Sequence, residues 1–302
     1  MATDNGRRRA EGPARAGQGA PARGETAPAA GGRGRRARHR RRVKRFLLAA
    51  DALLLCVLIF ALAQLVRTLA DYRRSAGRYE QIAEAVVSTA APAAAQAAPA
   101  EQPARTAQPS EVPIQVDFAA LKAANPDAAA WLYCADTPVN YPAVLGPDNS
   151  YYLYRAFDGS DDSAGTLFFD CRNSPDLTDR HLVLYGHRMK DDSMFGSLVG
   201  YAEESYREAH PVMYLLTEAQ NYRVEIFACR TVTADDLDNF TVHFPDESAY
   251  IRYLADAVSD SYWQPPFPIE RGYATLTMVT CSTYRSDTNP RVLVHGRLVP
   301  VD

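Results

Sequence analysis

The chain has 302 residues, of which 47% are hydrophobic, and a net charge of −3. This balance combines a basic region, residues 1–45 with a net charge of +11, and an acidic remainder with a net charge of −14. The five cysteines lack a C-x-x-C motif and framework spacing, which excludes a disulfide-rich scaffold.

Residues 1–45 are rich in Gly, Ala, Pro and Arg and almost free of large apolar side chains. Such a segment cannot bury enough surface to offset its chain entropy, so we expect it to be disordered. A basic tail of this kind could bind nucleic acid, but its place beside an apolar segment favours anionic lipid headgroups. We therefore expect no nucleic-acid partner.

An apolar segment of 21 residues follows at 46–66. As a helix it would span roughly 31 Å, about the thickness of the hydrocarbon core of a bilayer. Asp51 lies within one turn of the basic end, where its carboxylate can reach the interface. The Lys and Arg excess precedes the segment, so the positive-inside rule places residues 1–45 in the cytoplasm and the remainder outside the cell.

The alternative for this segment is a cleavable signal peptide, because Ala61-Leu62-Ala63 resembles a cleavage site. The long basic region favours a retained anchor, and the spacing in RRVKRFLL argues against a twin-arginine signal. The composition of residues 67–112 predicts a spacer that begins as a helix and continues as an Ala/Pro/Gln-rich segment. Residues 113–302 then form one domain with a full core.

Within this domain, residues 116–133 predict a short helical segment, interrupted at 125–127. Short runs rich in Val, Leu, Tyr, Phe and Thr follow, separated by Gly, Pro, Asn and Asp, and they predict a β-sandwich or barrel. These runs lie at 137–145, 165–170, 181–187, 212–217, 222–232, 274–281 and 291–299. A helix is expected at 246–260, in a late connection between strands.

Three residues could carry chemistry together. Cys281 ends a predicted strand, Arg291 opens the next, and an antiparallel hairpin would set them opposite each other at one rim. A thiol needs a base or an imidazolium to become a useful nucleophile. His187 ends the run HLVLYGH before a polar loop, whereas His181 opens its strand and His295 lies mid-strand.

These residues lie in motifs that resemble those of the sortase family of cysteine transpeptidases. TLTMVTC, with an arginine ten residues after the cysteine, and LYGHRMKDDSMFGSL are most similar to class B. The resemblance covers the whole exported domain, including the helix at 246–260. Two positions depart from the family pattern: Met278 replaces a leucine, a volume-conserving change, and Phe240 stands where a tyrosine is common.

The resemblance implies a closed, mainly β barrel of about eight strands, and it assigns roles. Cys281 matches the nucleophile, His187 the acid/base, and Arg291 the residue that positions substrate and stabilises the oxyanion. Asn149, Tyr185 and Thr280 match positions near the substrate groove.

The implied reaction cleaves a sorting motif after threonine through a thioacyl-enzyme. It then joins the secreted protein to a cell-wall amine of a Gram-positive-type bacterium. The implied partners are secreted proteins with a C-terminal sorting signal and a peptidoglycan precursor or cross-bridge amine, and no cofactor is implied.

Other functions stay open from the sequence. A pilin-polymerising sortase would use a subunit lysine as its amine, although the end of the chain at Asp302 argues against its usual extra C-terminal membrane segment. A tethered binding barrel without catalysis, or a cysteine protease, are the other candidates.

No metal site is expected, because the acid pairs at 161–162, 191–192 and 235–236 have the character of solvated loops. At most one disulfide is expected among Cys134, Cys171 and Cys229, which are more simply interpreted as small buried side chains.

Overall fold

The computed structural model describes residues 32–89, 112–269, 272–281 and 290–301. It contains two compact units, Met1–Ala63 and Gln64–Asp302. The expected tail before residue 32, the low-complexity part of the spacer at 90–111 and the loop that follows Cys281 lie outside the described residues.

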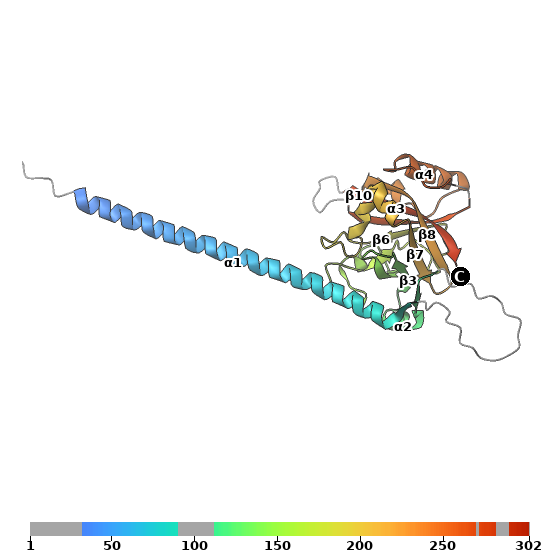
Figure 1. Ribbon diagram of the computed structural model, residues 1–302, viewed down its shortest axis with the longest axis horizontal. Coiled ribbons are helices and arrows are strands. Elements are labelled where there is room, and N and C mark those ends of the chain that lie inside the picture. Colours follow the sequence, from blue (N-terminus) through green and yellow to red (C-terminus); the bar gives the residue numbers. More distant parts are fainter. Residues whose placement is uncertain (1–31, 90–111, 270–271, 282–289, 302) are drawn as a thin grey trace, which may run out of the picture. The chain divides into compact units, whose positions relative to one another are not determined.

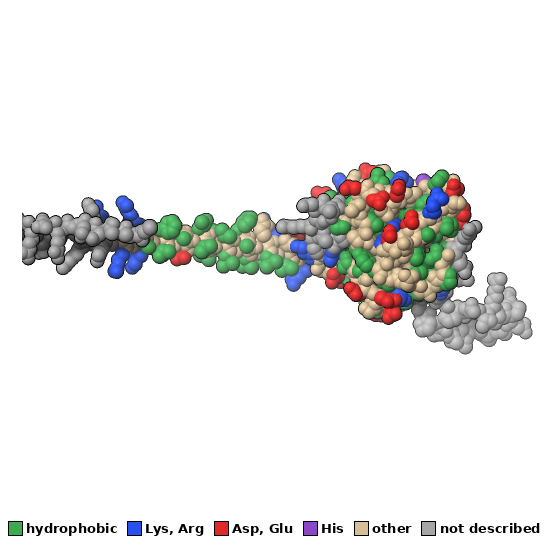
Figure 2. Space-filling model, turned by 90° about the horizontal axis from the view of Figure 1, so that it is seen from above, with side chains coloured by type: hydrophobic (Ala, Val, Ile, Leu, Met, Phe, Trp, Pro, Cys, Tyr) green, Lys and Arg blue, Asp and Glu red, His purple; other side chains and the backbone are tan. Residues whose placement is uncertain are grey.

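Helix α1 runs without interruption from Gly32 to Val86. It includes a segment that is long and apolar enough to cross a membrane, and hydrophobic side chains surround this segment (Figure 2). Residues 32–45 belong to this helix, whereas the sequence led us to expect no regular structure there. The apolar segment that follows them continues the helical hydrogen bonding, which explains why the backbone of this basic stretch is ordered.

The second unit is built on a closed barrel of eight strands, as the sequence predicts (Figure 1). The strand order is β10-β8-β7-β3-β4-β5-β6-β9. Its strands are β3 (Ala128–Tyr133), β4 (Asn140–Val144), β5 (Leu167–Phe169), β6 (His181–Tyr185), β7 (Val212–Thr217), β8 (Asn221–Thr233), β9 (Ala274–Cys281) and β10 (Pro290–Val301). Two neighbouring pairs, β4 with β5 and β6 with β9, are parallel, and the other pairs are antiparallel.

The helical prediction for residues 116–133 is right for α2 (Phe118–Ala124) and wrong for β3. Asp117 caps α2 by accepting from the backbone N–H of Ala120 at 2.9 Å. The alanines of β3 favour a helix by themselves, but β3 pairs with β4 on one side and β7 on the other. This pairing, together with complete burial of Trp131 and Leu132, outweighs the local preference.

Short helices lie between the strands. They are the 3₁₀ helices η1 (Tyr151–Tyr154), η2 (Gly196–Ala202) and η3 (Leu237–Phe240), and the α-helices α3 (Glu204–Ala209) and α4 (Glu247–Ser259). Helix α4 confirms the predicted late helix. Its N-cap Asp246 accepts from the backbone N–H of Ala249 at 2.8 Å, and Tyr250 and Leu254 pack against Phe227 of β8.

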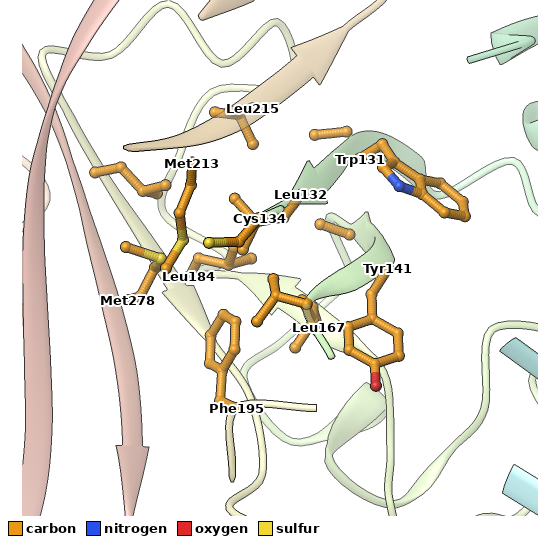
Figure 3. Close-up of a cluster of buried hydrophobic side chains, with 14 of the residues drawn as sticks. Trp131, Leu132, Cys134, Tyr141, Leu167, Leu184, Phe195, Met213, Leu215 and Met278 are labelled. Carbon is orange, nitrogen blue, oxygen red and sulfur yellow. The ribbon is translucent and has the colours of Figure 1, made fainter. Parts of the chain in front are cut away.

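The barrel interior is filled by large apolar side chains from opposite strands (Figure 3). Met278 of β9, the departure from the family pattern, is fully buried there, so the exchange for leucine is accommodated. Cys134 and Cys229 are buried free thiols, as expected. Cys171 is an exposed free thiol, and the expectation of burial is wrong for this residue because it lies in the turn after β5.

The packed unit begins well before residue 113, the boundary that the sequence suggested. Strand β1 (Val87–Thr89) pairs with β2 (Ile114–Val116), and Tyr79 of α1 is buried in the main core. Ser75 of α1 donates to Asp162 at 2.6 Å, and Arg78 donates to the same carboxylate at 3.0 Å. The expectation that Asp162 is solvated is therefore wrong, because α1 covers this loop.

Candidate active site

Strands β6, β9 and β10 bring the three predicted catalytic positions to one rim of the barrel. In the antiparallel pair of β9 with β10, Cys281 is the register partner of Arg291. In the parallel pair of β6 with β9, Tyr185 is the partner of Val279, and the N–H of Gly186 donates to the carbonyl of Val279 at 3.1 Å. The pairing ends at Tyr185, and His187 follows two residues later at the same rim, where it lines a groove together with Arg291.

A groove with a volume of about 660 Å³ opens at this rim. Its lining combines polar groups with an apolar wall, which is the composition of a site for a peptide or another extended ligand. It is lined by Asn149, Leu153, Tyr154, Phe168, Arg172, Tyr185, Gly186, His187, Ala234, Leu237, Phe240, Val279, Thr280 and Arg291.

The imidazole of His187 is oriented by η1. Its Nε2 lies 2.6 Å from the carbonyl oxygen of Leu153, and its ring lies against that of Tyr154 with 5.3 Å between centroids. A carbonyl only accepts, so Nε2 carries a proton, and in the neutral ring the lone pair is on Nδ1. Burial lowers the pKa of His187 below its ordinary value. The hydrogen bond to Leu153 opposes this shift, and the positive charge of Arg291 adds to it.

Gly186 directly follows β6 at a position where no side chain fits. A Cβ atom at this position would lie 2.5 Å from the side chain of Leu167 and 2.6 Å from that of Phe195. Both side chains are fully buried and cannot move aside. The glycine therefore determines where the backbone of His187 lies.

Asn149 and Tyr185, two of the predicted substrate contacts, line the groove and converge on Asp170. Asn149 Nδ2 and Tyr185 Oη donate to Asp170 Oδ2 at 3.0 and 2.9 Å, and Arg172 donates to both carboxylate oxygens at 2.7 Å. Burial raises the pKa of Asp170, but the hydrogen bonds from Arg172 and Tyr185 and the positive charge of Arg172 outweigh it and hold the pKa below the ordinary value. Asn149 and Tyr185 therefore line the groove and also hold the buried carboxylate of Asp170 in place.

Thr280, the third predicted contact, also lines the groove. It is 2% exposed, and its Oγ1 has no hydrogen-bond partner within the described part of the chain. A buried hydroxyl of this kind is available to a ligand that enters the groove.

Two further groove residues, Arg172 and Leu237, were not singled out from the sequence, and Phe240 was noted only as a departure from the family pattern. Arg172 links Asp170 to the apolar wall of the groove, because its Nη2 also donates to the carbonyl of Phe240 at 2.7 Å. Leu237 and Phe240 form that wall on η3. The position of Phe240 before the late helix gave a signal through the family resemblance, whereas an Asp170–Arg172 pair in a turn gives no signal of this role.

Comparison with known proteins agrees with this architecture. The sortase domain family matches residues 144–299. Sortase B of Listeria monocytogenes is 32% identical over 179 residues, which cover 59% of this chain and 72% of that protein. Sortase B of Staphylococcus aureus is 25% identical over 188 residues, which cover 62% and 77% respectively.

Solved structures show the same fold. A sortase B from Bacillus anthracis superposes with a TM-score of 0.61 at 28% identity, covering 77% of this chain and 99% of that one. A sortase B from Clostridium perfringens superposes with a TM-score of 0.57 at 28% identity, covering 61% and 100%. The chain belongs to the sortase family and is a cysteine transpeptidase of the class B type.

Proposed function

We propose that this protein is a membrane-anchored transpeptidase that cleaves a sorting motif after threonine and joins the secreted protein to a cell-wall amine. The observation that carries the proposal is the register of the rim. The pairing of β9 with β10 sets the backbone of Cys281 opposite Arg291, and Arg291 and His187 both line the groove that opens at this rim.

In the first half-reaction the thiolate of Cys281 attacks the carbonyl carbon of the motif's threonine. The carbonyl oxygen gains negative charge, and the guanidinium of Arg291 stabilises it. The C–N bond then breaks, and the leaving amine takes from His187 the proton that its imidazole received from the thiol of Cys281. The product is a thioester between Cys281 and the threonine.

In the second half-reaction an incoming amine attacks the thioester carbonyl. His187 removes the proton that the amine loses as it forms the amide, and Cys281 leaves as a thiolate. The pair therefore returns to its starting protonation state, and no cofactor is consumed.

Related proteins support the assignment of the partners. One structure of Staphylococcus aureus sortase B holds its substrate, and another sortase B structure holds a triglycine. We infer that this chain takes a sorting-signal peptide in the groove and a primary amine of a peptidoglycan precursor or cross-bridge as acceptor.

The apolar segment of α1 supports anchoring in the cell membrane. Basic residues precede it, so we propose that residues 1–45 lie in the cytoplasm, that 46–66 cross the membrane and that the catalytic part lies outside. Contact with membrane lipids occurs through this anchor. The enzyme, its sorting substrate and a lipid-linked amine then meet at one surface.

The test uses the full chain in detergent micelles, with fluorogenic peptides that carry LPxTG-like and NPxTG-like motifs. Each peptide is incubated with and without an amine acceptor, and Cys281→Ala is the control. Intact mass spectrometry of the quenched reaction detects the thioester. We expect an adduct on the native chain that converts to an amide-linked product only when the amine is present.

Two results would contradict the proposal. Hydrolysis at the same rate with and without amine would identify a protease. A folded chain that forms no adduct with any peptide of the panel would favour a tethered binding barrel without catalytic activity.

A further inference from the structure

The apolar wall of the groove is held by its backbone carbonyls. Three consecutive residues at the end of η3, Asn239, Phe240 and Thr241, each have their carbonyl oxygen bound by a different side chain, and Phe240 among them lines the groove. Tyr253 Oη donates to the first at 3.2 Å and Arg172 Nη2 to the second at 2.7 Å, and His181 Nδ1 lies 2.6 Å from the third. We call residues 239–241 the carbonyl-bound wall.

His181 is the end of a hydrogen-bond chain that crosses four neighbouring strands. Arg230 Nε of β8 lies 3.4 Å from His295 Nε2 of β10, and His295 Nδ1 lies 2.9 Å from Thr277 Oγ1 of β9. Thr277 Oγ1 in turn lies 2.8 Å from His181 Nε2 of β6. The four side chains are at most 3% exposed, so water does not compete for these bonds.

The two ends of the chain determine its direction. A guanidinium only donates and a carbonyl only accepts. Arg230 therefore donates to His295 Nε2, which leaves the proton of neutral His295 on Nδ1, where it is donated to Thr277. The Thr277 hydroxyl donates to His181 Nε2, and His181 donates its Nδ1 proton to Thr241. Every donor and acceptor is satisfied only when both histidines are neutral and protonated on Nδ1.

We propose that His181 is a positioning residue for substrate binding: the chain from Arg230 through His295 and Thr277 aims its Nδ1–H at Thr241 and so holds the carbonyl-bound wall in the shape that the peptide meets. The inference rests on the proposed function of the groove. It assigns to His181 a purpose that the burial of a histidine alone would not require.

If the peptide lies in the groove as proposed, Phe240 contacts it before and during the reaction, so loosening of the carbonyl-bound wall weakens ground-state and transition-state binding alike. Loss of the His181 bond should therefore raise KM and leave kcat almost unchanged. A purely structural role would lower thermal stability without this separation of the two kinetic constants.

The test compares two amides at position 181 in the full chain. The amide nitrogen of His181→Asn occupies the place of Nδ1 and can still donate to Thr241, whereas that of His181→Gln occupies the place of Nε2 and cannot. We expect His181→Gln to raise KM for the sorting peptide about 3- to 10-fold, the effect of one neutral hydrogen bond, with kcat within about twofold of the native value. His181→Asn should keep KM close to the native value.

A second pair of variants tests the middle of the hydrogen-bond chain. Thr277→Val removes the hydroxyl that connects the two histidines, and we expect a rise in KM in the same direction, which Thr277→Ser should reverse. Equal KM values for His181→Asn and His181→Gln would overturn the proposal, as would a Thr277→Val variant with a native KM.

Two further measurements separate failure of this proposal from failure of the proposed function. If the native chain turns over no peptide, amide hydrogen exchange of residues 237–241 still tests the positioning role of His181. Faster exchange in His181→Gln than in His181→Asn supports the positioning role, and equal exchange overturns it. Nitrogen-15 NMR of labelled histidines should show the neutral Nδ1–H form at positions 181 and 295 near pH 7. An Nε2–H form at either position would contradict the direction of the hydrogen bonds inferred above.

Discussion

The imidazole of His187 donates its Nε2 proton to the carbonyl of Leu153 at 2.6 Å. The hydrogen bond holds the ring at the edge of the groove and keeps the Nδ1 atom for proton exchange with a reacting group. It also separates two properties of the residue that a substitution to alanine would remove together, namely ring placement and proton transfer.

His187→Gln distinguishes these properties, because the amide nitrogen of glutamine can replace Nε2 in the bond to Leu153. We expect the melting temperature to stay within a few degrees of the native value, while the rate of product formation falls by about 10²- to 10⁴-fold, the usual contribution of a general acid/base. Stopped assays with the fluorogenic peptide measure the rate, and circular dichroism follows melting. A variant with more than a tenth of native activity would exclude His187 as the acid/base.

Arg291 is the register partner of Cys281, and the oxyanion role proposed for it would use both the shape and the charge of its side chain. Arg291→Lys keeps the charge and loses the planar, two-pronged donor, whereas Arg291→Gln loses both. We expect kcat to fall by about 10²- to 10³-fold in Arg291→Gln, as for loss of an oxyanion donor, and by less in Arg291→Lys. Equal activity of the two variants would show that the charge has no part in the reaction.

Gly186 predicts a combined loss of stability and activity. In Gly186→Ala the new methyl group meets Leu167 and Phe195, which should cost about 1–3 kcal/mol of unfolding free energy and shift His187. Gly77→Ala is the matched control, because its Cβ meets no atom within 4 Å and the residue lies in α1. We expect that control to be neutral or to stabilise by up to about 1 kcal/mol. Native activity in Gly186→Ala would contradict this account of the His187 backbone.

The packing of Tyr79 predicts that a chain shortened to residues 113–302 is much less stable than one that begins at residue 64. The Tyr79 ring is 3% exposed, packs edge-on against Tyr141 with 5.4 Å between centroids, and donates to the carbonyl of Gly165. Tyr79→Ala should remove about 3–5 kcal/mol, the cost of a large aromatic side chain in a core. Denaturant titrations of both chains and of the variant test this, and equal midpoints would contradict it.

The buried His181 predicts an acid-sensitive fold. Burial lowers its pKa from 6.5 to about 4, against the opposing effects of the Thr241 hydrogen bond and of the negative charges of Asp170 and Asp179. Between these two values the unfolded chain binds the extra proton, so the stabilisation present above pH 6.5 is lost as the pH falls towards 4. The full loss from this group is about 3 kcal/mol.

Thermal melting at several pH values between 4 and 7 checks this dependence. His181→Asn cannot take up the proton, and it should show a flatter profile over the same interval. A native profile as flat as that of the variant would show that His181 does not contribute to the pH dependence.

Much of this architecture is predictable from local pattern. The strand-forming runs, the late helix and the pairing of Cys281 with Arg291 follow from sequence, because strand-forming runs that are adjacent in the chain usually pair with each other. The strand at Ala128–Tyr133 was not predictable, since its alanines take their conformation from the neighbouring strands. The burial of Asp162 likewise depends on α1, which is distant along the chain.

Some of the polar groups around the groove can be predicted from the sequence, and others cannot. Residues at strand ends, such as His187, can be found from the pattern alone. The Asp170–Arg172 pair and the chain through Thr277 could not, because each bond joins elements that only the closed barrel brings together. A threonine or histidine in the middle of a strand has the same local appearance whether or not it has such partners.

The parallel pairing of β6 with β9 has a consequence for the timing of activity. These strands lie far apart in the chain, and contacts between distant segments form late because loop closure must precede them. His187 and Cys281 therefore come to the same rim only when the barrel closes. Under the proposed mechanism, a newly made chain has no assembled catalytic site until then, so the appearance of transpeptidation during refolding would report the closure of the barrel.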